Sequence, residues 1–205
     1  LSSLFYAFRD CLSFCYATTN DHFIATILVC SGRALSDLCR CHIFLPFDLF
    51  VVMENDFDGI SWCYDSIVKL IFGGRLHRAS IQWLETLNTS DKVMILGGGS
   101  GKILKYLTHV ECIIFIEKSP KMIKLAKASA PENVQFICAD FLKHTIESES
   151  SHVVICPFFL DLFSPIQLGE VLNKIARILK KKGALFVSDF QYTTWWSKQL
   201  IKLMY

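Results

Sequence analysis

The chain has 205 residues, a formal net charge of +2 and a hydrophobic content of 52%. This length can bury a full hydrophobic core, and the charge balance shows no excess of basic residues of the kind that nucleic-acid-binding proteins carry. The spaced lysines Lys121, Lys124 and Lys127 are interpreted as the solvated face of a helix rather than as a track for phosphates.

Residues 1–52 differ in composition from the rest of the chain. They hold no Lys, Glu or Met, but five of the nine cysteines and seven of the seventeen phenylalanines. Their apolar runs are shorter than the ~18 residues of a membrane span, and a signal peptide would need an initiating Met and a basic start. Cys39 and Cys41 lack the second pair of a zinc site. We expect a poorly ordered appendage, as translation from upstream of a true start would give, and a domain over residues 53–205.

Residues 92–104, KVMILGGGSGKIL, place four glycines in five positions directly after an apolar run. A nucleotide-binding P-loop would need glycine at position 96 and a hydroxyl at 103, where the chain has Leu96 and Ile103. A dinucleotide-binding loop would need a third small residue where the chain has Lys102. Both patterns therefore fail.

Three alternate glycines remain in this loop, Gly97, Gly99 and Gly101. Bare backbone at these positions allows a ligand to approach closely between a strand and the start of a helix. The pattern favours a nucleoside-type ligand, and a plain structural turn is the alternative.

A second buried strand is expected over residues 112–116, with Glu117 at its end and a helix that begins at Ser119-Pro120. Glu117 lies twenty positions after Gly97. At this offset a carboxylate can accept hydrogen bonds from the two hydroxyls of a ribose. A solvated glutamate at a strand end is the alternative.

The third expected strand covers residues 134–139 and is followed by Asp140 and Phe141. A carboxylate beside an aromatic ring suits an adenine, because the carboxylate accepts from the amino group and the aromatic ring packs on the base. Asp140 could equally cap a helix.

Two further strands are expected, one ending near Pro157 and one over residues 184–188, after a helix that ends at Lys180–Lys182 and Gly183. Five apolar strands alternating with helices predict an α/β fold, a doubly wound and mostly parallel sheet with helices on both faces. Ligands of such sheets bind beyond the carboxyl ends of the strands, where the glycine loop, Glu117, Asp140 and Pro157 fall.

The run VMILGGGSG, Glu117 after the second strand, the triplet at residues 139–141 and KKKGALFVSDF together resemble class I S-adenosylmethionine-dependent methyltransferases, over about residues 56–205. Upstream, residues 57–84 resemble the N-terminal helices of small-molecule methyltransferases, including quinone-biosynthesis types, in which a Tyr-Asp pair lies near the cofactor. One departure is Ile95, where the family often carries an acidic residue.

The resemblance implies a Rossmann-like fold, S-adenosylmethionine as cofactor, methyl transfer to an unidentified small-molecule acceptor, and a cytoplasmic protein without metal, nucleic-acid or membrane partners. The implied cofactor-binding residues are Tyr64, Gly97, Gly98, Gly99, Gly101, Glu117, Lys118, Asp140, Phe141 and Pro157. A general base is needed only if the acceptor atom carries a proton, and none is assigned among the candidates Asp161, Tyr64, Asp65 and His77.

Two other functions stay open: a non-catalytic module that binds a nucleoside or a protein, and an NAD-dependent oxidoreductase, which Lys102 opposes. In the resembled family the fifth strand is followed by a helix and a hairpin that completes a seven-stranded sheet. The sequence supplies the fifth strand and a segment over residues 195–205 that suits the helix. We therefore expect a fragment without the last two strands, with an unpaired and association-prone edge and little activity.

Overall fold

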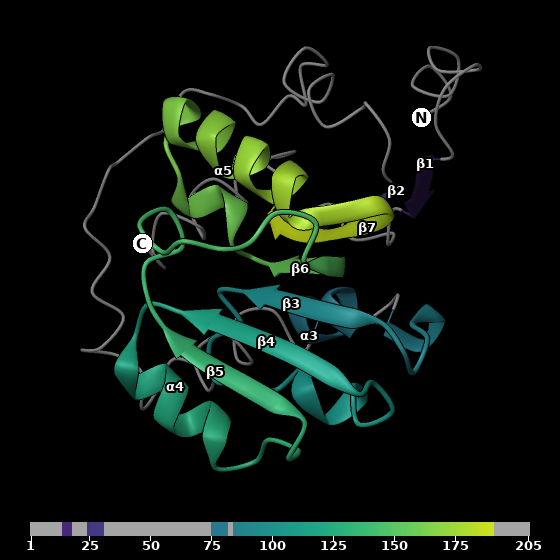
Figure 1. Cartoon of the computed structure of the whole chain (residues 1–205), viewed down its shortest axis with the longest axis vertical. Helices are drawn as coiled ribbons and strands as arrows, with labels where there is room; N and C mark the ends of the chain where they lie inside the picture. Colours follow the sequence, from purple (N-terminus) through teal and green to yellow (C-terminus); the bar gives the residue numbers. More distant parts are fainter. Residues whose placement is uncertain (1–13, 18–23, 31–74, 82–83, 191–205) are drawn as a thin grey trace.

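A computed structural model of the chain describes residues 14–17, 24–30, 75–81 and 84–190. Tyr64, Asp65 and the segment over residues 195–205 lie outside this part of the chain. Its central element is a seven-stranded sheet with the order β1-β2-β7-β6-β3-β4-β5 (Figure 1).

Five neighbouring strands of this sheet are parallel, which confirms the predicted fold class. Their carboxyl ends lie at one edge of the sheet, because parallel strands all point the same way. The strands are β3 (Lys92–Leu96), β4 (Cys112–Glu117), β5 (Val134–Cys138), β6 (Ser151–Pro157) and β7 (Leu179–Phe190).

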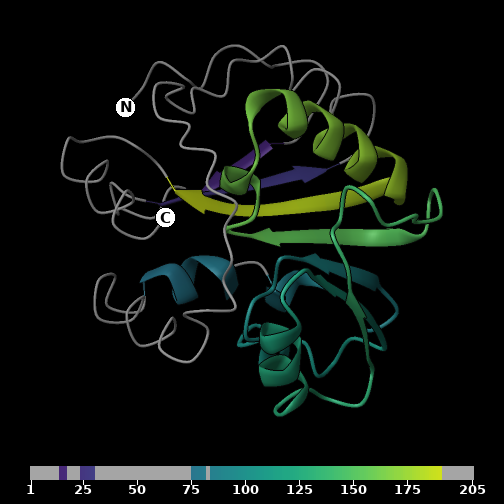
Figure 2. The same cartoon turned by 90° about the vertical axis from the view of Figure 1, so that its left-hand side faces the viewer.

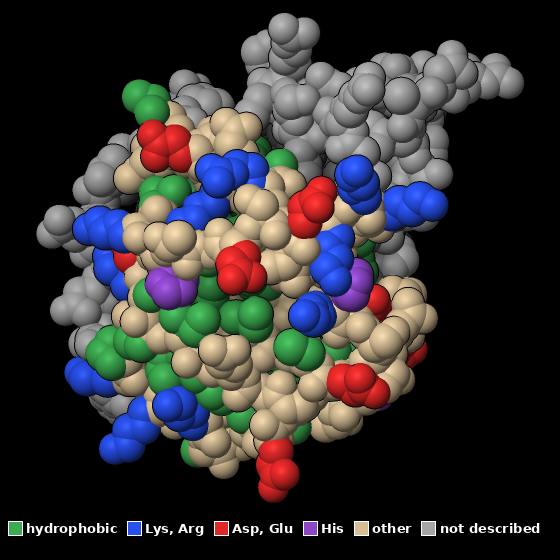
Figure 3. All heavy atoms as spheres, viewed as in Figure 1, with side chains coloured by type: hydrophobic (Ala, Val, Ile, Leu, Met, Phe, Trp, Pro, Cys, Tyr) green, Lys and Arg blue, Asp and Glu red, His purple; other side chains and the backbone are tan. Residues whose placement is uncertain are grey.

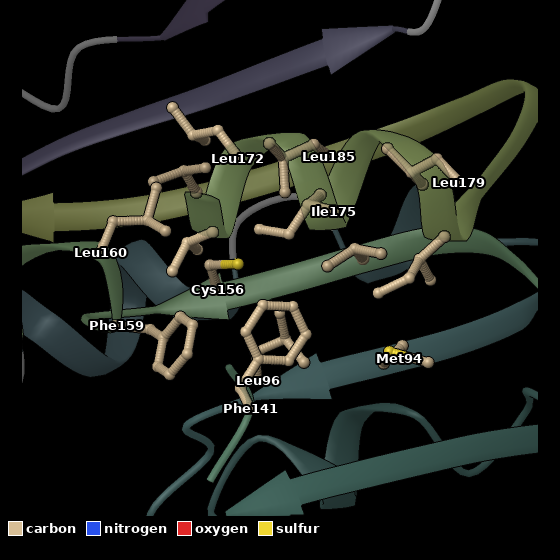
Figure 4. Packing of buried hydrophobic residues seen from close by; sticks show 14 of the residues in the cluster. Met94, Leu96, Phe141, Cys156, Phe159, Leu160, Leu172, Ile175, Leu179 and Leu185 are labelled. Carbon is tan, nitrogen blue, oxygen red and sulfur yellow. The ribbon is translucent and has the colours of Figure 1, made fainter. Parts of the chain in front are cut away.

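The pleat of these strands sends alternate side chains to two core layers. Met94 and Leu96 face α5 (Pro165–Ile178), and with it form the first core cluster (Figure 4). Ile95 and Phe115 face the other layer. That second core cluster includes residues of α4 (Pro120–Lys127), η1 (Leu84–Thr86) and η2 (Leu104–Tyr106). Helices thus cover both faces of the sheet, as the apolar strands predicted.

Both long helices begin at a serine followed by proline. The Ser119 hydroxyl accepts a hydrogen bond from the Met122 N–H, and Pro120 is the first residue of α4, as the sequence predicted. Ser164 and Gln167 form a reciprocal capping box at the start of α5. These caps satisfy N–H groups that have no partner within the first turn of a helix.

The predicted helix end at Lys180–Lys182 is wrong. Helix α5 ends at Ile178, and Leu179 already pairs with Ser151 of β6 as the first residue of β7. The next pair, Val153 with Ala184, skips three extra residues of β7, so the lysine run forms an irregularity in the strand. Lys182 takes φ +65° there. Lysines and glycine are also common at helix ends, which explains the misreading.

The prediction of an unpaired edge beside β7 is also wrong. Strand β2 (Ile24–Cys30) pairs antiparallel with β7 over seven residues, and β1 (Phe14–Ala17) pairs antiparallel with β2 (Figure 2). These two strands occupy the side of the sheet where the resemblance expected a hairpin from downstream. Their backbone hydrogen bonds satisfy the edge of β7. The appendage assigned to residues 1–52 therefore contributes two strands, while the rest of that segment lies outside the described residues.

The face seen in Figure 3 carries hydrophobic side chains in its middle, bordered by charged ones. Several residues packed against the first core cluster are only partly buried: Ile114, Ile137, Leu142 and Ile146. Ile114 and Ile137 belong to β4 and β5, whereas α5 contacts β7. The described residues therefore cover β4 and β5 less completely on this face.

Candidate functional site

The loop after β3 has the backbone that its glycines predicted. Gly97, Gly99 and Gly101 have φ values of +65°, +55° and +76°, in the left-handed region that side chains with a Cβ seldom adopt. Gly101 also lies against α4, since a Cβ there would stand 2.6 Å from that of Ala126. A Cβ at Gly99 would meet no atom within 4 Å. The loop is therefore tight on its helix side and open at Gly99.

Glu117 connects the ends of two adjacent strands. Its Oε2 accepts a hydrogen bond from the Gly99 N–H at 3.1 Å, and its Oε1 accepts one from the Ser119 N–H at 3.0 Å. Each carboxylate oxygen has two lone pairs, so each can accept a further donor. The partly exposed carboxylate is thus fixed beside the open position of the loop. Neighbouring Lys118 is exposed, and its carbonyl lies 3.7 Å from the thiol of Cys138.

Asp140 and Phe141 follow β5 at the same edge. The Oδ1 of Asp140 accepts a hydrogen bond from the Leu142 N–H at 3.0 Å, so Asp140 caps a turn rather than a helix. The ring of Phe141 is buried in the first core cluster, with 4% of its surface exposed. It packs edge-on against Phe159 at 5.9 Å between centroids (Figure 4). The structure thus brings Asp140 to the edge of the sheet at which the parallel strands have their carboxyl ends, and it places the Phe141 ring in the core.

Pro157 ends β6, and the two residues after it form part of the same edge. Phe158 has φ +54°, which is strained for an aromatic residue, and its N–H donates to the carbonyl of Ser188 at 2.6 Å. A Cβ at Gly97 would stand 2.4 Å from the Phe159 ring. Neither phenylalanine was predicted from the sequence as a residue of this edge. The available signal was their position directly after a proline at a strand end.

Two of the four candidate bases lie among the described residues. His77, on α3 (Arg75–Ile81), has its Nε2 2.9 Å from the Tyr106 hydroxyl. Burial lowers the pKa of His77, and the charges of Lys105 and Lys102 lower it further. The Asp161 N–H donates to Asp189 at 3.1 Å.

In the part of the chain that the structure describes, no three His, Cys, Asp or Glu side chains form a cluster suited to a metal ion. Over the same residues, no helix has the length and hydrophobicity to cross a membrane. Cys156 is fully buried, and this burial, with a smaller effect from Asp189, raises the pKa of its thiol well above the usual value. Cys138, the last residue of β5, is exposed.

Comparison with known proteins gives a family match for part of the chain. Residues 93–183 match a family model described as "Methyltransferase domain". No sequence among curated proteins matches the chain. Among solved structures, a Haloferax volcanii complex of a methyltransferase with the Trm112 methyltransferase activator is similar at 22% identity and a TM-score of 0.54, covering 64% of this chain and 57% of that one.

The structure of MccD protein is similar at 19% identity and a TM-score of 0.50, covering 60% of this chain and 58% of that one. YcgJ protein from Bacillus subtilis has 20% identity and a TM-score of 0.49, covering 54% and 50%. The chain thus spans between half and three fifths of the length of these structures. The likeness to the Haloferax volcanii and MccD structures shows the fold, and the family model supplies an independent match over residues 93–183.

Proposed function

We propose that residues 93–183, which match the methyltransferase family model, form a class I S-adenosylmethionine-dependent domain, and that the protein methylates a small-molecule acceptor. The observation that carries the proposal is the Glu117 carboxylate, hydrogen-bonded to the Gly99 N–H beside an open glycine. A carboxylate in this position can accept from both hydroxyls of the cofactor's ribose. We propose a small molecule as the acceptor because residues 57–84 resemble the N-terminal helices of small-molecule methyltransferases.

The described residues fit the cofactor chemically. Gly99 offers space where a Cβ would meet no protein atom, which suits the close approach of a nucleoside. Asp140 stands at the end of the neighbouring strand, where its carboxylate would accept from the adenine amino group. Ile95 is fully buried in the second core cluster, so no carboxylate from that position reaches the cofactor's amino group.

When bound, S-adenosylmethionine would supply a methyl group that is already activated on a sulfonium. The protein's tasks are to align the acceptor with the bond between this methyl group and sulfur and to exclude water. If the acceptor atom carries a proton, a base must take it. Burial lowers the pKa of His77, which favours the neutral ring that a general base needs.

Two alternatives are disfavoured by particular residues. Glu117 and Asp140 both stand at the expected edge, which disfavours a module that has lost the cofactor. An NAD-dependent oxidoreductase is disfavoured by Lys102, which is exposed where a dinucleotide loop needs its third small residue. Here Gly101 makes the close approach to α4 instead.

Calorimetric titration with S-adenosylmethionine, S-adenosylhomocysteine and NAD tests the proposal. We expect binding of the first two and none of NAD. Glu117→Gln should weaken S-adenosylhomocysteine binding by about 1.5–3 kcal/mol, the loss expected when a charged acceptor of hydrogen bonds is removed.

Glu111→Gln is a matched control, because Glu111 is exposed directly before the amino end of β4, at the opposite edge of the sheet. Its affinity should equal that of the unchanged protein. NAD binding by the unchanged protein, or equal S-adenosylhomocysteine affinity in a folded Glu117→Gln variant, would contradict the assignment.

A further inference from the structure

Helix α5 sends one lysine across to the turn that follows β5. The Nζ of Lys174 donates hydrogen bonds to three backbone carbonyls: Phe141 O at 2.5 Å, Leu142 O at 3.1 Å and His144 O at 2.5 Å. An ammonium group has three N–H donors, so these carbonyls use its full donor capacity. The contact joins two segments that lie 30 to 33 positions apart in the sequence.

The same turn directs its N–H groups to Asp140. The Leu142 N–H donates to Asp140 Oδ1, while the N–H groups of Lys143 and His144 donate to the Asp140 carbonyl at 3.1 and 2.9 Å. The turn is thus held from both sides, with its N–H groups bonded to Asp140 and its carbonyls bonded to Lys174. Without Lys174, three carbonyls of the turn would lose this donor. Asp140 would then be held mainly by the N–H groups of the turn.

The charges support this arrangement. Lys174 is partly buried, and desolvation is the main cause that lowers its pKa; the charge of Asp140 acts in the opposite direction and Arg177 adds to the lowering. The ammonium also lies 4.8 Å from the centroid of the Phe141 ring, a favourable cation–π distance. The long side chain is therefore fixed between the core and the turn rather than extended into solvent.

The turn begins next to the residue proposed to bind ribose. The Ala139 N–H donates to the Glu117 carbonyl at 3.0 Å, and Asp140 is the next residue. We propose that Lys174 is a positioning residue, which fixes the turn so that the Asp140 carboxylate accepts the adenine amino group. This inference rests on the proposed function, because it assigns Lys174 a role in selecting adenine within the same site.

Nucleobase selectivity separates positioning from general stability. S-inosylhomocysteine carries a carbonyl oxygen in place of the adenine amino group, so a fixed carboxylate repels it. We expect the unchanged protein to prefer S-adenosylhomocysteine by tenfold or more. Lys174→Met should reduce this preference to threefold or less, mainly by weakening S-adenosylhomocysteine binding. Lys143→Met, which removes an exposed lysine of the same turn, should keep the full preference.

Asp140→Asn measures the selectivity that remains without the carboxylate. If Lys174 acts through Asp140, the double variant Asp140→Asn with Lys174→Met should lose no more selectivity than Asp140→Asn alone. Should Lys174→Met fail to fold, Lys174→Gln is measured in the same way. Full selectivity in a Lys174 variant, or an equal loss of affinity for both nucleosides, would overturn the inference. Failure of the unchanged protein to bind either nucleoside would instead overturn the proposed function.

Discussion

Strand β2 is set against β7 so that Cys30 lies directly opposite Ala184. Opposed residues of an antiparallel pair have Cα atoms about 4.5–5.5 Å apart, within the range that a disulfide spans. We therefore expect Ala184→Cys to form a disulfide with Cys30 under mild oxidation. The bond would close a loop of about 155 residues, for which the loss of chain entropy in the unfolded state corresponds to at most about 5 kcal/mol.

Non-reducing electrophoresis should show a faster band for oxidised Ala184→Cys, and its urea midpoint should rise by up to about 2 M relative to the reduced form if the slope is about 2–3 kcal/mol per M. The control is Ala184→Cys in a Cys30→Ser background, which should show neither change. Leu185→Cys should not cross-link to Cys30, because neighbouring strand residues point to opposite faces. If Cys30 stays alkylatable in oxidised Ala184→Cys, or if Leu185→Cys cross-links equally well, the register is refuted.

Two further predictions concern the parallel core and α3. Gly98→Ala should lower the free energy of unfolding by about 1–3 kcal/mol, because the added Cβ would stand 2.3 Å from the buried ring of Phe115. The melting temperature should fall by several degrees. A melting temperature equal to that of the unchanged protein would contradict this packing. The NMR titration of His77 should have its midpoint below 6.5, and Lys105→Gln should move it upward. Because the pKa of His77 is lower in the folded state, the unfolded state binds more protons, and the free energy of unfolding should fall as the pH drops from 6.5 through that lowered pKa. A midpoint at or above 6.5 would refute the effect of burial on His77.

Local signals made the parallel half of the sheet predictable. Glu117 and Ser119 lie where a buried strand ends and a helix starts, and each feature is encoded within a few neighbouring residues. The backbone at Gly99 was predictable for the same reason, because a positive φ favours glycine at the very residue that adopts it. The ribose and adenine contacts themselves remain predictions.

Features that depend on distant pairing were not predictable. The lysine run at residues 180–182 has the composition of a helix end, and only the pairing of Leu179 with Ser151 turns it into part of a strand. The aromatic ring of Phe141 could equally have packed on a ligand, until α5 and Phe159 were seen to enclose it. Lys174 carries no motif, since its three partners become neighbours only when the chain folds.

The pairing of β2 with β7 also has a consequence for the order in which the molecule assembles. Each residue pair between these strands joins positions 154 to 166 apart, whereas β3 and β4 join positions 20 apart. During synthesis, β2 leaves the ribosome early, whereas its partner β7 is made only after strands β3 to β6. A two-stranded hairpin is at best marginally stable alone, and contacts between distant positions form slowly. We therefore expect the parallel strands to assemble first and the N-terminal pair to dock last, so that newly made chains pass through a stage in which the outer edge of β7 is open to other chains.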